Sequence, residues 1–239
     1  MASELEVGKI GVGAAPSTYQ LDVTTTGNNG IRTGNGTDQV YMGSTGGAAA
    51  IGTLSDTALN VITNGTSRLS VTNYGLATFS NGIAFSGQTD TSATGAAATS
   101  TTLDHYEEGT WTATMTCGSG TITVDTTADL MRYTRIGRVV HFSGSLTISA
   151  ISSPSSWARI VGLPFPNSAG AEEQSTSTGA VRANTLASDC GISGLTLYVN
   201  ETYDWMYLQA FDGQNQSNIT DHIGVGTQLV ISGSYTTDA

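Results

Sequence analysis

An aromatic segment near the C-terminus carries the side chains with the clearest chemistry. Residues 202–211 read TYDWMYLQAF, and as a strand they direct Met206, Leu208 and Ala210 to a core and the rings to the opposite face. Such rings stack on the C–H faces of sugars, and their polar edges bond hydroxyl groups. The candidate residues, with one tyrosine from a neighbouring strand, are Tyr198, Tyr203, Trp205, Tyr207 and Phe211.

The same aromatic row has a second interpretation, as a contact between protein chains. Tyrosine and tryptophan are enriched at protein interfaces, and a continuous aromatic surface is costly to leave in water. On the sequence alone the interface is the favoured interpretation. Binding of a receptor sugar is the alternative.

Paired carboxylates are the groups that cleave polysaccharides, and the sequence has two adjacent pairs, Glu107 with Glu108 and Glu172 with Glu173. Hydrolysis needs two carboxyl groups that flank one glycosidic bond. Neighbours on a strand point to opposite faces, so neither pair fits this geometry. The sequence also lacks a Gly-x-Ser-x-Gly elbow and a phosphate loop ending in Gly-Lys-Ser/Thr. We therefore predict no catalytic residues, no cofactor and no enzymatic activity.

Metal binding has little support in the sequence. Asp125 and Asp129 flank an expected turn, but their spacing lacks the glycine-hinged ligand loop of a calcium site. The histidines His105, His141 and His222 are far apart and form no His-x-x-x-His pair. We expect no metal site.

Composition indicates an all-β chain with many turns. The 239 residues include 30 glycines, which supply the positive φ angles of tight turns, and no apolar pattern of helical period extends over three turns. Nineteen acidic against eight basic residues give a net charge of −11, which disfavours binding to nucleic acid. No apolar run approaches the roughly 20 residues that span a bilayer, so membrane insertion is not expected.

Alternating residues predict a β-sandwich or jelly-roll head over residues 104–239. At residues 110–117 every second position is apolar, and residues 139–150 place Val140, Phe142, Leu146, Ile148 and Ala150 on one face. Residues 88–103 are small and polar and are expected to form a linker. Residues 103–108 are expected to form one helical turn.

Residues 1–87 are predicted to form a glycine-rich β shaft. Short strands are expected at residues 19–23, 58–62 and 68–71, with a tight turn at Asn64–Gly65. Each strand unit offers few apolar side chains, too few to offset an ordering entropy of about 1–2 kcal/mol per residue. This sparse core favours an elongated shaft in which several protomers intertwine.

Two N-terminal segments and several C-terminal ones resemble bacteriophage tail-fibre and appendage proteins. Residues 10–23 (IGVGAAPSTYQLDV) and 58–69 (ALNVITNGTSRL) are similar to segments common in those proteins. The C-terminal half resembles a β-domain found at the ends of such fibres. The segments that carry this second resemblance are residues 106–112, 133–140, 162–166 and 231–236.

The resemblance implies a homotrimeric, non-enzymatic virion fibre that assembles in the bacterial cytoplasm. Its N-terminal region would dock on other virion proteins, and its distal β-domain would bind a bacterial surface polysaccharide by multivalent adhesion. One alternative is a purely architectural virion protein, such as a head decoration or a connector. A polysaccharide-degrading spike is the third.

Overall fold

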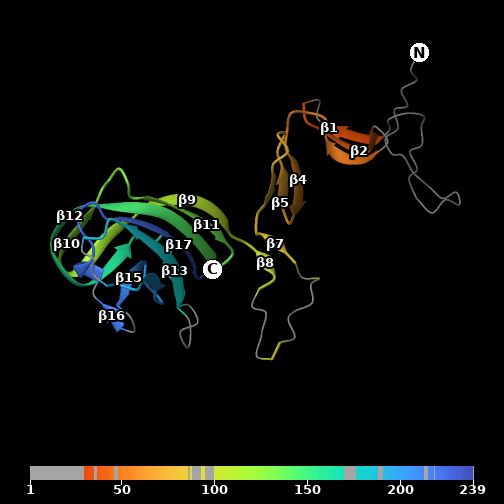
Figure 1. The fold of residues 1–239 in the computed structure, drawn as a ribbon. Coiled ribbons are helices and arrows are strands. Elements are labelled where there is room, and N and C mark those ends of the chain that lie inside the picture. Colours follow the sequence, from red (N-terminus) through yellow and green to blue (C-terminus); the bar gives the residue numbers. More distant parts are fainter. Residues whose placement is uncertain are drawn as a thin grey trace, which may run out of the picture. The chain divides into compact units, whose positions relative to one another are not determined.

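The computed structural model describes residues 30–34, 37–45, 48–85, 87, 93–94, 100–169, 176–187, 191–212, 215–217 and 219–238. Strands dominate these residues (Figure 1), which confirms the predicted all-β fold. Within them the one helical element is a single 3-10 turn, η1 (Ile219–Asp221). No helix in the described part of the chain is long and apolar enough to cross a membrane.

The chain separates into two compact units, Met1–Asn81 and Gly82–Ala239. This division lies N-terminal to the predicted linker at residues 88–103. The first unit contains two three-stranded antiparallel sheets in which strands that follow one another in sequence pair. They consist of β1 (Gly30–Gly34), β2 (Gln39–Thr45) and β3 (Ala48–Thr53), and of β4 (Leu59–Thr63), β5 (Thr66–Val71) and β6 (Ala77–Phe79).

The turn between β4 and β5 has the predicted conformation. Asn64 (φ 50°) and Gly65 (φ 71°) both lie in the left-handed region, as a type I′ turn requires. The strands predicted at residues 58–62 and 68–71 are confirmed as β4 and β5. The strand predicted at residues 19–23 lies outside the described residues.

One face of the β4–β5–β6 sheet is apolar and partly exposed. The register pairs Leu59 with Val71 and Val61 with Leu69, and Phe79 stands opposite Leu69, so all five side chains share that face. The other face carries Asn60, Ser70 and Thr78. No side chain described between residues 37 and 81 is buried. The described part of this unit therefore has no hydrophobic core of its own.

The second unit holds a small two-stranded sheet and a nine-stranded sheet. The small sheet pairs β7 (Ile83–Ala84) with β8 (Thr102–Leu103). The nine strands of the large sheet are β9 (Tyr106–Thr112), β10 (Thr114–Val124), β11 (Leu130–Ile136), β12 (Val139–Val161), β13 (Ser177–Asn184), β14 (Gly194–Val199), β15 (Trp205–Asp212), β16 (Asn215–Ser217) and β17 (Gln228–Thr236).

The 23-residue strand β12 pairs with four other strands of the large sheet. Its first half pairs with β11 and β17, and its second half pairs with β10 and β15. Because β15, β14, β13 and β17 also pair in succession, the sheet closes on itself through β12 (Figure 1). Positive φ angles at Ser153 and Ser156, and register shifts between β10 and β12, accompany the bend.

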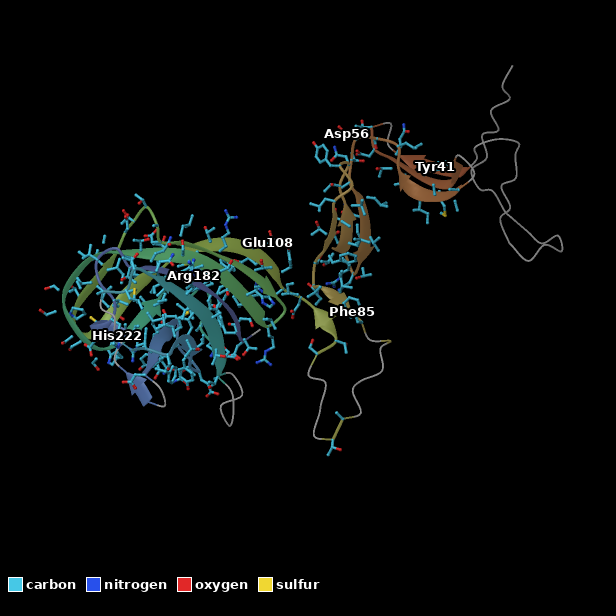
Figure 2. All side chains as sticks on the ribbon, in the orientation of Figure 1. Tyr41, Asp56, Phe85, Glu108, Arg182 and His222 are labelled. Atoms are coloured by element: carbon cyan, nitrogen blue, oxygen red, sulfur yellow. The ribbon has the colours of Figure 1, made fainter. Side chains whose placement is uncertain are left out.

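The buried apolar side chains of this unit form one hydrophobic core. Figure 2 shows the side chains on the ribbon. The predicted alternation is confirmed for Val140, Phe142, Leu146 and Ile148, all of which are buried. Ala150 is exposed, contrary to prediction. A register shift between Thr123 and Val124 of β10 reverses the facing of β12 at this point.

The helical turn predicted at residues 103–108 is also wrong. Leu103 ends β8, and Tyr106 begins β9. Tyr106 and Glu108 pair with Ile136 and Thr134 of β11, so the backbone obtains its hydrogen-bond partners from a distant strand.

Candidate functional site

The predicted aromatic row lies on the outer face of β14 and β15. Met206, Leu208 and Ala210 are buried, as predicted, while Trp205 and Tyr207 face outward and are half-buried. Tyr198 of β14 stands opposite Tyr207 on the same face. Tyr203 precedes β15 and is 43% exposed.

Four of the five predicted rings contact one another. Tyr203 stacks on Trp205 with 4.4 Å between ring centroids, and Trp205 meets Tyr207 edge to face at 4.7 Å. Tyr198 and Tyr207 lie 6.5 Å apart. Phe211, further along β15, has no such contact with another described ring, so the structure brings together four of the predicted residues.

Two residues that the sequence analysis did not select complete the group. Trp157 and Arg159 lie on β12, and the register places Arg159 directly opposite Tyr207. Alternation along residues 157–161 could have assigned Trp157 and Arg159 to the outer face. The pairing of β12 with β15 joins residues 48 positions apart, which no local pattern shows.

The Arg159 guanidinium lies over three rings. Its Cζ atom is 3.8 Å from the ring centroid of Trp205, 4.0 Å from that of Trp157 and 4.7 Å from that of Tyr207. These distances are within the roughly 6 Å of a cation–π contact. Its Nη2 donates a hydrogen bond of 2.6 Å to the Tyr207 hydroxyl. We call Trp157, Arg159, Tyr198, Tyr203, Trp205 and Tyr207 the aromatic–arginine cluster.

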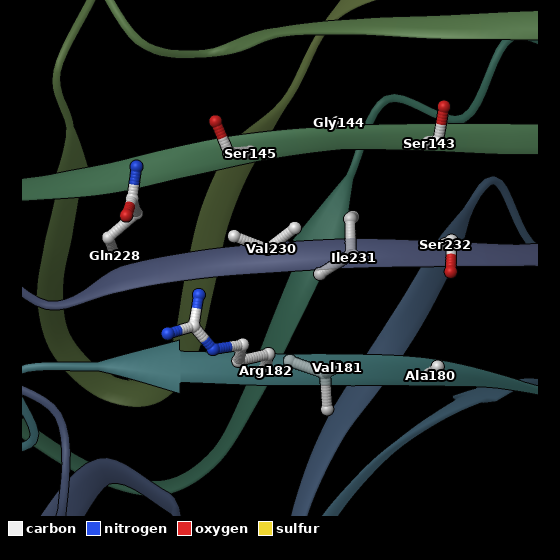
Figure 3. A pocket seen from close by; sticks show the side chains of 10 residues that line it. All are labelled: Ser143, Gly144, Ser145, Ala180, Val181, Arg182, Gln228, Val230, Ile231 and Ser232. Atoms are coloured by element: carbon white, nitrogen blue, oxygen red, sulfur yellow. The ribbon is translucent and has the colours of Figure 1, made fainter.

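A shallow groove of about 550 Å³ lies on another part of the same sheet (Figure 3). It crosses β12, β17 and β13, where the register aligns Ser143 with Ser232 and Ala180, and Ser145 with Val230 and Arg182. Its walls offer hydroxyl groups, aliphatic surface and one guanidinium, but no aromatic ring. It therefore lacks the stacking surface that the cluster offers.

Glu107 and Glu108 lie in strand β9, and their adjacent carboxylates point to opposite faces of it. Glu108 accepts a hydrogen bond from Tyr106 on the exposed face, and Glu107 accepts one from Tyr133 on the other. The Tyr133 hydroxyl, with a second hydrogen bond from His105, lowers the pKa of the Glu107 carboxyl below its ordinary value. The pair Glu172 and Glu173 lies outside the described residues.

Asp125, one of the two aspartates considered for calcium, holds a turn through hydrogen bonds to Thr127. Asp125 accepts hydrogen bonds from the backbone N–H and the hydroxyl of Thr127, at 2.9 and 2.8 Å, and these bonds lower the pKa of its carboxyl. Asp125 thus stabilises the turn before β11. Across the described residues no three His, Cys, Asp or Glu side chains gather in a group that could hold a metal ion.

No protein-family model matches this chain, and no curated protein matches it. Among solved structures, the chain is similar to the Dettilon tailspike protein (gp208), with 18% sequence identity and a TM-score of 0.48. The match covers 55% of this chain and 24% of that chain, so this chain spans about a quarter of the tailspike. A phage tailspike is thus a weak structural neighbour of this chain.

This comparison corrects one prediction. The sequence predicts no enzymatic activity, but the neighbour belongs to a class, the tailspikes, that often degrades polysaccharide. That prediction is therefore withdrawn. The experiments proposed below measure cleavage of polysaccharide as well as binding to it.

Proposed function

We propose that this chain is a subunit of a phage tail appendage and that its C-terminal unit binds a polysaccharide of the bacterial surface. The observation that carries the proposal is the aromatic–arginine cluster. Tyr203 presents an exposed ring on a fixed stack, and the neighbouring tyrosine hydroxyls and guanidinium offer hydrogen bonds. Rings with polar groups at their edges suit sugars, which have apolar C–H faces and polar rims.

The packing of the cluster supports the sugar platform over a protomer contact. The interface interpretation assumed an aromatic row fully open to water. In the folded chain Tyr198, Trp205 and Tyr207 are half-buried against one another and against Arg159, and Tyr203 alone among the cluster residues is more than a third exposed. The cluster therefore does not need a second chain to cover it.

Assembly of the subunit is proposed to occur through the N-terminal unit, as a homotrimer. The exposed apolar face of the β4–β5–β6 sheet supports this, because a sheet with one apolar and one polar face is stable when the apolar face is covered. Three chains that share a core would each cover the apolar face of another. Three weak sugar sites on one appendage would then bind with high avidity.

A purely architectural virion protein is the second candidate. The same exposed face favours it, since another virion protein could occupy the position assigned here to further copies of the chain. Docking on such proteins is assigned to the N-terminal region in both proposals, and the two differ in whether the C-terminal unit binds bacteria.

Binding to bacteria tests the proposal. Fluorescently labelled protein is added to a panel of bacterial strains and, where it binds, to adsorption assays with phages of that strain. We expect saturable labelling that competes with phage adsorption. The Tyr203→Ala variant should label the bacteria at least tenfold more weakly. Tyr74→Ala, which removes a tyrosine 91% exposed in the N-terminal unit, is the matched control and keeps full binding.

Release of reducing ends from purified surface polysaccharide is measured in the same samples. Release that depends on the protein would add cleavage to binding. The adhesion proposal would be refuted if the correctly assembled protein labelled no strain, or if the Tyr203→Ala variant labelled bacteria as well as the original protein does. Either result would favour the architectural proposal.

A further inference from the structure

Arg159 occupies the centre of the aromatic–arginine cluster, and no carboxylate of the described residues forms an ion pair with it. The two strands that flank the second half of β12 present uncharged residues to it, Thr116 of β10 and Tyr207 of β15. Arg159 takes part in neither the ion pair of His105 with Glu107 nor that of Arg138 with Asp238. In a chain with 19 acidic residues and 8 basic ones, this arginine has packed against rings instead of an acid.

The guanidinium also retains hydrogen-bonding capacity. The guanidinium has five N–H donors. One N–H on Nη2 donates a hydrogen bond to the Tyr207 hydroxyl, and the buried Nε has no acceptor among the described residues. Contacts with Trp157 and Trp205 hold the planar group in place, so little side-chain entropy remains to be lost when a ligand binds. A fixed guanidinium fork matches the two oxygens of a carboxylate or phosphate.

Resting on the polysaccharide-binding function proposed above, we infer that the cluster selects acidic polysaccharides. Arg159 bonds the carboxylate or phosphate of an anionic sugar residue, and the ring of Tyr203 stacks on a sugar of the same chain. The net charge of −11 repels anionic polymers at long range. Selection for acid must therefore come from this local site and not from general attraction.

Binding to an array of bacterial polysaccharides of known composition tests the inference. The array holds uronate-containing, phosphate-containing and neutral polymers, and each uronate polymer is also present with its carboxyl groups reduced to alcohols. We expect signal on acidic polymers and a loss of at least tenfold after carboxyl reduction. Comparing the signal on uronate-containing polymers with that on phosphate-containing polymers shows whether the site binds a carboxylate or a phosphate.

Three variants test whether Arg159 selects acidic polymers or only holds the aromatic rings of the cluster in place. Arg159→Gln is expected to lose at least tenfold in binding to acidic polymers, and Arg159→Lys, which keeps the charge, to recover part of it. Arg182→Gln removes an exposed arginine from the groove and should bind as the original protein does. Near-ultraviolet circular dichroism of each variant reports whether the aromatic stack is intact.

Equal binding to neutral and carboxyl-reduced polymers would overturn the inference while leaving the polysaccharide function in place. The inference would also be overturned if the Arg159→Gln variant kept an intact aromatic stack and still preferred acidic polysaccharides. Absence of binding to every polymer, by an assembled protein, would instead overturn the proposed function itself.

Discussion

Replacing Val61 by aspartate should prevent assembly of the subunits. In the single chain 49% of the Val61 side chain is exposed, and it lies on the apolar face of β4–β5–β6. Burying an aliphatic side chain fully is worth about 1.5–3 kcal/mol, so covering the exposed half contributes roughly 0.7–1.5 kcal/mol per chain. Over three chains this is roughly 2–4.5 kcal/mol, or at least a 30-fold loss in the association constant. A desolvated carboxylate adds to the penalty.

The assay is the molar mass by light scattering during gel filtration at micromolar concentration. The control is Asn60→Asp, which adds the same charge to the same strand on its polar face. We expect a trimer for the original chain and for Asn60→Asp, and a monomer for Val61→Asp. All three tryptophans lie in the C-terminal unit, so their fluorescence checks that this unit remains folded. An unchanged trimer for Val61→Asp would refute the assignment of this face to the interface.

Three further predictions concern the C-terminal unit and are read from urea unfolding of the full chain by tryptophan fluorescence. Leu146→Ala should lower the free energy of unfolding by about 2–5 kcal/mol because Leu146 is fully buried. Ser143→Ala, at an exposed position of the same strand, should change it by less than about 0.5 kcal/mol, and equal effects would contradict the core assignment. Gly109→Ala should destabilise by about 1–3 kcal/mol, since its Cβ would lie 2.6 Å from the Tyr133 hydroxyl oxygen, and an unchanged midpoint would contradict that packing. Because the pKa of Glu107 is lowered in the folded chain, its ionised form stabilises the fold above pH 4.5, and this stabilisation is lost as the pH falls through the folded-state pKa. Glu107→Gln should therefore be less stable than the original chain at pH 7, and the difference should be smaller at pH 3. A difference in unfolding free energy that does not change with pH would contradict this prediction.

The fold class and much of the core were predictable because their signals are local. A period of two along a strand separates buried from exposed residues without knowledge of the partner strands, and this is why Met206, Leu208 and Ala210 were assigned correctly. Asn64–Gly65 likewise fixes its turn through the φ angles that the two residues tolerate.

Predictions failed or fell short where distant pairing decides the structure. A bulge against β10 turned Ala150 outward, and pairing with β11 made Tyr106 the start of a strand. Four of the six residues of the aromatic–arginine cluster were predicted, but Trp157 and Arg159 join it only because the bent strand β12 reaches β15. The central cation of the cluster was therefore not visible in the sequence around the aromatic row.

The most direct test of the account is a fluorescence titration with polysaccharide purified from a strain that the protein labels. Trp157 and Trp205 lie in the cluster, whereas Trp111 is buried in the core. Binding at the cluster predicts a saturable fluorescence change that persists in Trp111→Phe and disappears when Trp157 and Trp205 are both replaced by phenylalanine. Saturable binding whose fluorescence change is unaffected by that double replacement, or that produces no change at all, would place the polysaccharide elsewhere and contradict the account.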